Sequence, residues 1–329
     1  MPANPKVIVL GLLIVIIFGL GFAAAYFKYR PELVAADSDE LLLQELRKAK
    51  SIGNNVLQSR SIIDHDGSFK SDAQTGWWES ISPVSQVSGL PPLRADHSTV
   101  VVFVHGYNVS LDRSIMYGNA VWSELQQVGP KAGSADYFQQ VTFCTFCWRG
   151  DFGPEHFGTA ENSARNTAAS LAGLMVKLQE QAASEHKQVS FILISHSLGA
   201  MVCLEALNQL WHRDHKPWVR CLLMLEPAVQ VETISHGQYT ETLVWSEPGP
   251  GGRLMRNVER TTQTNSAVYF DAFQAANTVL ATSSAADEVL GKLYYPQARL
   301  DVKCTWEAEN DGLVADHPRQ ALIVALYGD

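Results

Sequence analysis

From residue 98 onward, short apolar runs rich in β-branched residues alternate with longer stretches whose apolar residues recur at helical spacing. Short runs that are apolar throughout are typical of strands buried on both faces. Their alternation with helices predicts an α/β fold, with a mostly parallel sheet covered by helices on both faces. The predicted strands span residues 98–106, 139–148, 188–197, 219–227, 278–284 and 299–306, and the predicted helices residues 115–128, 160–181, 198–211, 269–277 and 317–328.

The N-terminus carries a different signal. Val7 to Phe27 contains no charge, proline or amide, and as a helix it would span about 30 Å of hydrocarbon. We expect an uncleaved single-pass anchor over residues 1–30. A cleaved signal peptide is the alternative, since Ala23 to Ala25 suits a cleavage site, and the mature protein would then be secreted or periplasmic. Basic residues lie on both sides of the run, which leaves the side of the membrane open.

Two further segments are set apart by composition. Residues 31–58 predict a stalk or short amphipathic helix, after which a single α/β domain would occupy residues 59–329. Residues 230–265 contain Gly249, Gly251 and Gly252 near prolines, which predicts a flexible insertion, either a lid or a plain surface loop.

Charge and cysteine content exclude some classes of function. The 25 basic and 34 acidic residues give a net charge of -9, which argues against nucleic acid as a partner.

The five cysteines do not predict a disulfide framework. Cys144 and Cys147 have redox or zinc spacing, but residues i and i+3 of a strand face opposite sides, so both are expected to be buried apolar residues. The polar cluster of His212, Asp214 and His215 is expected to be solvated, and no metal site is predicted.

The sharpest motif is Ser195-His196-Ser197-Leu198-Gly199, which lies where a predicted strand meets a predicted helix. A nucleophile elbow has this context: a tight turn that lifts the serine above the sheet and requires small residues two positions before and after it. The Leu198 N–H would then lie at the helix start, where it can stabilise an oxyanion. An ordinary serine N-cap is the alternative.

A second motif, His105-Gly106-Tyr107-Asn108, ends the first predicted strand. In a fold with such an elbow the loop after this strand supplies the other oxyanion-hole N–H, and Tyr107 is the candidate donor. Gly106 lets the backbone approach the reacting centre. We expect the His105 side chain to be a hydrogen-bonded core residue.

The remaining catalytic groups follow later strands. Asp287 comes just after the predicted strand 278–284 and is the expected acid, with Glu226 as the main alternative and Asp271 as a weaker one. His317 follows the last predicted strand and is the only histidine after His236, so it is the expected base. The order Ser, Asp, His is the one that α/β-hydrolases use.

At these residues the chain resembles the α/β-hydrolase superfamily, and specifically a family of unknown function whose members carry HGYN or HGFN and a tryptophan after the next strand. The tryptophan here is Trp148, although the family's usual Trp-Pro is Trp-Arg. The resemblance covers roughly residues 98–327 and implies serine-hydrolase chemistry by Ser197, Asp287 and His317, without a cofactor. The expected substrate is a small hydrophobic ester met at the membrane; a non-catalytic membrane-tethered scaffold and an acyltransferase are the alternatives, and the oligomeric state is open.

Overall fold

The alternating runs build one sheet. The computed structural model describes residues 39–68, 70, 79–81, 86–87, 89–131, 138, 140–153, 156–229, 237–249, 252–264, 269–282 and 300–305. Within these ranges eight strands form a sheet in the order β10-β7-β6-β4-β5-β1-β2-β3. All neighbours from β10 to β1 are parallel, and only β2 and β3 run antiparallel to their neighbours. The strands are β1 (Asn54–Gln58), β2 (Glu79–Ile81), β3 (Gln86–Val87), β4 (His97–Val104), β5 (Val141–Cys147), β6 (Gln188–His196), β7 (Val219–Leu225) and β10 (Val279–Thr282).

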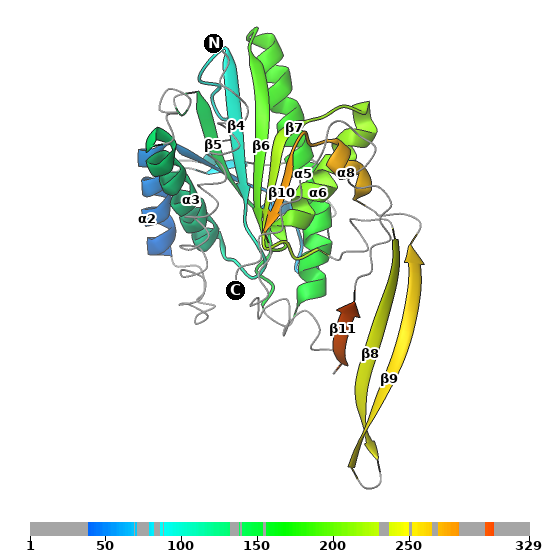
Figure 1. Ribbon diagram of the computed structural model, residues 1–329. Helices are drawn as coiled ribbons and strands as arrows, with labels where there is room; N and C mark the ends of the chain where they lie inside the picture. The colour runs from blue at the N-terminus through cyan, green and yellow to red at the C-terminus, as the bar shows by residue number, and fades with distance from the viewer. Residues whose placement is uncertain are drawn as a thin grey trace.

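Helices cover both faces of this sheet, as predicted (Figure 1). Successive strand residues point to opposite faces, so β4 divides its side chains between two cores. Val100, Val102 and Val104 pack with α5 and α6, whereas Val101 and Phe103 pack with α3. The helices are α2 (Asp39–Ile52), α3 (Leu111–Lys131), α5 (Phe157–Ser184), α6 (Gly199–Asp214) and α8 (Phe270–Gln274).

The segment expected to be a stalk contributes to this domain. It does contain the predicted amphipathic helix, α2, but β1 follows at once and pairs with β5 in the sheet. A buried chain of amides joins the two elements to α3: Asn54 donates to Asn119 at 2.9 Å, and Asn119 donates to Glu45 at 2.8 Å. Buried polar groups need such partners, so the domain extends back to at least residue 39, before the predicted boundary at 58.

The segment 230–265 and the last predicted strand differ from expectation. β8 (Gly237–Gly249) and β9 (Gly252–Thr264) form a long antiparallel hairpin in place of a flexible loop, and Gly249 pairs with Gly252 at its tip. Figure 1 shows this hairpin extending away from the main sheet. β11 (Leu300–Thr305), expected to join the parallel sheet, pairs antiparallel with β8 in a separate three-stranded sheet. The alternating polar and apolar residues of Leu300–Thr305 suit such a sheet better than one buried on both faces.

The predicted anchor, residues 1–30, lies outside the described residues. Among the helices within the described ranges, none combines the length and the apolar composition needed to cross a bilayer.

Candidate active site

The Ser197 motif forms a strained turn between a strand and a helix. β6 ends at His196, α6 begins at Gly199, and Ser197 between them has a φ of 50°. The Ser197 N–H donates to the Leu225 carbonyl at 2.9 Å, which ties the turn to β7. A non-glycine residue with positive φ costs free energy and is found at functional sites more often than elsewhere. The sharp turn predicted for residues 195–199 is therefore confirmed.

The positions on either side of this turn have no room for larger side chains. A Cβ added to Gly199 would lie 2.4 Å from the His105 carbonyl oxygen and 2.5 Å from that of Val104. Ser195 is fully buried, with its Oγ 3.4 Å from the Leu223 carbonyl oxygen. The close approach of α6 to the end of β4 explains why small residues flank Ser197.

The loop after β4 lies directly against the Ser197 turn. A Cβ added to Gly106 would lie 2.9 Å from both the Ser197 Cβ and the His196 Nδ1. The structure thus brings the Gly106 backbone against the His196–Ser197 turn. The first N–H groups of a helix have no acceptor within the helix, and those of α6 begin here. The His196 ring, which the sequence did not single out, also borders this region.

His105 is a buried, hydrogen-bonded core residue, as predicted. It has no exposed surface; its Nδ1 lies 2.9 Å from the Gly106 carbonyl oxygen and its Nε2 accepts the Trp148 backbone N–H at 3.1 Å. Burial lowers the pKa of His105 to about 3, so the ring is neutral at physiological pH. Its place away from the surface excludes contact with substrate.

Trp148, which directly follows β5, packs against His105. Its indole N–H donates to the His105 carbonyl at 2.7 Å, and the two rings stack at 5.5 Å with an interplanar angle of 13°. The sequence pointed to Trp148 only through family resemblance and gave no role for it. No local pattern indicates this contact, because 43 residues separate the partners.

The loop after β5 is held to the loop after β4 and to the chain near residue 60. The Asn108 N–H donates to the Gly150 carbonyl at 2.8 Å, and the Tyr107 hydroxyl donates to the Gly153 carbonyl.

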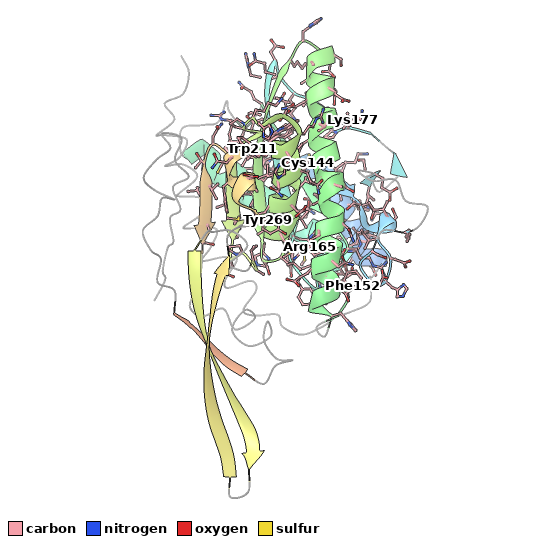
Figure 2. The ribbon with its side chains drawn as sticks, turned by 90° about the vertical axis from the view of Figure 1, so that its right-hand side faces the viewer. Cys144, Phe152, Arg165, Lys177, Trp211 and Tyr269 are labelled. Carbon is pink, nitrogen blue, oxygen red and sulfur yellow. The ribbon has the colours of Figure 1, made fainter. Side chains whose placement is uncertain are left out.

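Arg60 binds the same loop from the N-terminal part of the domain. It donates to the Trp148 carbonyl at 3.1 Å and forms an ion pair with Asp151. Figure 2 locates this loop by Phe152, which lies near one end of α5. These contacts link the two loops to each other and to Arg60.

The sequence comparison with protein families agrees with this geometry. The model of a family described as "Alpha/beta hydrolase of unknown function (DUF900)" matches residues 92–268, more than half of the chain. The chain belongs to this family. The match covers the Ser197 turn and the His105–Asn108 loop, and it confirms the α/β-hydrolase fold.

Among solved structures, a weak overall likeness is found to Est1E from Butyrivibrio proteoclasticus with bound ferulic acid. That protein is 13% identical, with a TM-score of 0.28, over 73% of this chain and 84% of that one. A structure described under LipS and LipT, two metagenome-derived lipolytic enzymes, is 12% identical, with a TM-score of 0.29 over 71% of this chain and 84% of that one. Such low values do not bear on the substrate of this α/β-hydrolase. No curated protein matches the chain significantly.

The predicted acid and base of this α/β-hydrolase, Asp287 and His317, lie outside the described residues. Glu226, the alternative acid, directly follows the Leu225 that binds the Ser197 N–H; its φ is 46°, and its own N–H donates to the Thr282 carbonyl at 3.1 Å. Asp271 pairs with His212 in the last turn of α6, about 20 Å along that helix from its start beside Ser197. Asp271 is therefore too distant to serve.

Four of the cysteines are buried in the core of the domain. Cys144, Cys147, Cys203 and Cys221 are free and buried. Cys144 and Cys147 belong to different cores, as their spacing predicted. Burial raises the pKa of Cys144 to about 12 and that of Cys147 to about 11, which keeps both as unreactive thiols. Within the described ranges no three metal-binding side chains form a group that could hold an ion.

Proposed function

We propose that the protein is a serine hydrolase that cleaves an ester-like bond, with Ser197 as nucleophile. The proposal rests mainly on the turn at Ser197, between β6 and α6. Ser197 has a φ of 50°, and Gly106 packs directly against it. An ordinary N-cap serine needs neither this strain nor a neighbouring loop at van der Waals distance. Backbone strain of this kind is kept where a side chain has to be aimed at a reacting group.

The proposed reaction has two steps. His317 takes the proton of the Ser197 hydroxyl, the oxygen attacks the ester carbonyl, and Asp287 orients His317 and stabilises its charged form. The N–H groups of Leu198 and Tyr107 hold the oxyanion that develops. Collapse of the tetrahedral intermediate breaks the bond to the alcohol, which leaves with the proton returned by His317, and the acyl group stays on Ser197. Water then attacks this acyl-enzyme as His317 takes its proton; the bond to Ser197 breaks, the proton returns to the serine oxygen, and the carboxylic acid is released. These steps require no cofactor.

The positions of the two backbone donors support this scheme. Leu198 precedes the first residue of α6, so its N–H lies at the positive end of the helix dipole. Tyr107 follows Gly106, whose Cα lies close enough to Ser197 that no side chain fits between them. An oxyanion on a carbon attached to Ser197 would form between the two peptides.

We further propose a hydrophobic ester as substrate and a membrane surface as the place of reaction. The support is the apolar run from Val7 to Phe27, since a protein held by one helix is exposed to a high local concentration of any ester dissolved in the same bilayer. A soluble short ester is the competing substrate class.

A series of p-nitrophenyl esters from acetate to octanoate, assayed with the detergent-solubilised full chain, tests both levels of the proposal. We expect turnover that Ser197→Ala abolishes, and kcat/KM that rises with chain length. A steep fall beyond butyrate would contradict the hydrophobic substrate while leaving the serine hydrolase in place. Equal turnover by the wild-type protein and Ser197→Ala would contradict the chemistry itself.

A further inference from the structure

We propose that His105 is a positioning residue for catalysis: its ring sets the direction of the Gly106–Tyr107 peptide, and Trp148 holds that ring in the one tautomer able to do so. The inference rests on the proposed function, because it concerns the peptide expected to supply the second oxyanion donor. It assigns a task to a buried histidine that cannot touch the substrate.

The hydrogen bonds of His105 admit a single tautomer. The Trp148 backbone N–H can only donate, so the Nε2 atom 3.1 Å away has to carry a lone pair. A neutral imidazole then bears its proton on Nδ1. Nδ1 lies 2.9 Å from the Gly106 carbonyl oxygen, which can only accept. Both bonds are satisfied together only when Nδ1 is the protonated atom.

This tautomer fixes the direction of the next peptide. The Gly106 carbonyl and the Tyr107 N–H belong to one planar peptide group, and in the trans form they point in opposite directions. Cis peptide bonds are absent from the described ranges. A carbonyl held by the His105 Nδ1–H therefore turns the Tyr107 N–H to the opposite side. Because Gly106 lies against Ser197, a rotation of this peptide would change the donor's angle beside the nucleophile.

Trp148 restrains His105 by three separate contacts. Its backbone N–H binds the ring, its indole N–H binds the His105 carbonyl at 2.7 Å, and its indole stacks on the imidazole. Neither residue has any exposed surface. Oxyanion donors contribute most when they are fixed before the reaction, so a rigid support behind the peptide has a catalytic consequence.

Two substitutions of His105 separate positioning from general packing. The side-chain amide of His105→Asn lies as many bonds from the backbone as Nδ1 and can still donate to the Gly106 carbonyl. The amide of His105→Gln corresponds to Nε2 and leaves that carbonyl without its donor. Both variants should lose stability, whereas kcat on p-nitrophenyl butyrate should fall on the order of 10- to 100-fold further in His105→Gln than in His105→Asn, with KM within about twofold.

A pair of tryptophan substitutions tests the support independently. Trp148→Phe removes the indole N–H bond to His105 and keeps an aromatic ring. Trp122→Phe is the matched control, because Trp122 is equally buried, donates its indole N–H to the Ile52 carbonyl at 2.8 Å and stacks on Phe143. Trp122 packs in the core on the α3 face of the sheet, whereas Trp148 packs with Leu198 in the core on the opposite face. We expect similar losses in Tm, with kcat reduced on the order of 10-fold only in Trp148→Phe.

The outcomes distinguish this inference from the proposed function. Turnover by the wild-type protein, with kcat lowered in His105→Gln and Trp148→Phe relative to their partners, supports it. Turnover with equal kcat within each pair overturns it and leaves the serine hydrolase standing. If both His105 variants fail to fold, the tryptophan pair decides alone. A wild-type protein without esterase activity overturns the proposed function and this inference together.

Discussion

At the scale of single residues, the site depends on positions where the backbone leaves no freedom. Ser197 adopts a left-handed conformation, Gly199 lies against two carbonyl oxygens, and His105 is completely enclosed. Each position carries a stability cost or constraint that serves the geometry around the serine. Stability measurements on single variants can therefore test the site before any substrate is known.

Gly199→Ala should lower the free energy of unfolding by about 1–3 kcal/mol, because the new Cβ would lie 2.4 Å from one backbone carbonyl oxygen and 2.5 Å from another, and neither can swing aside. Gly158→Ala in α5 is the control. No atom lies within 4 Å of its added Cβ, so its stability should be unchanged or higher by up to about 1 kcal/mol. Urea unfolding of the two variants gives the comparison, and equal effects would contradict the close approach of α6 to β4.

The buried His105 predicts a specific dependence of stability on pH. Its pKa is about 3 in the folded protein against an ordinary 6.5, so below pH 6.5 the unfolded chain binds a proton that the folded protein does not. Stability due to this group is present above pH 6.5 and is lost as the pH falls toward 3. Between pH 7 and pH 5 the loss should be about 2 kcal/mol.

His105→Asn has no titrating group at this position, so its unfolding free energy should depend less on pH over the same interval by that amount. Urea unfolding at pH 7 and pH 5 measures both proteins. The same pH dependence in the two proteins would show that His105 is protonated in the fold, which is incompatible with the single tautomer.

At the scale of elements, the proposed catalytic groups that the structure describes lie in loops at the carboxyl ends of parallel strands. The loops after β4, β5 and β6 meet around Ser197, and Glu226 follows β7 in the same row. The predicted acid, Asp287, comes five residues after the end of β10 in the sequence and lies outside the described residues. A pair of amide substitutions, one at each carboxylate, can show which of the two loops supplies the acid.

Asp287→Asn should lower kcat on the order of 10³- to 10⁴-fold, since an amide cannot hold His317 in the tautomer that accepts the serine proton. Glu226→Gln should have a much smaller effect and serves as the paired variant, with esterase kinetics and Tm measured for both. If Glu226→Gln is the more damaging change at equal stability, the acid belongs to the loop after β7.

Elements with strong local periodicity were predictable from the sequence. The strands around Ser197, the helices α3, α5 and α6, and the tight turn at residues 195–199 all follow from patterns within about 20 residues. The pairing of β1 with β5 in the main sheet was not predicted, because almost 90 residues separate the two strands. The hydrogen bonds of Trp148 to His105 and of Arg60 to Trp148 were not predicted for the same reason. β11 was assigned to the wrong sheet, because a short strand pattern does not specify its partner.

At the scale of the whole molecule, a folded body is joined to an N-terminal segment with the composition of a membrane anchor. The strands of the main sheet and helices α2, α3, α5, α6 and α8 pack against one another. Removal of residues 1–30 should therefore release the protein from the membrane fraction and leave its esterase activity. Fractionation and activity of the full and shortened chains test this. If expression of the whole chain yields a soluble protein whose first residue is Tyr26, the N-terminal segment is a cleaved signal peptide and not an anchor.

The central claim is that Ser197 is the nucleophile, and covalent labelling with a fluorophosphonate tests it most directly. The wild-type protein should gain the mass of one phosphonyl group, and peptide mapping should place it on Ser197. Ser197→Ala should take no label and keep a Tm close to that of the wild-type protein, because Ser197 is only half-buried and the change removes a single oxygen. Label that persists in folded Ser197→Ala would assign the nucleophile to another residue and contradict the account.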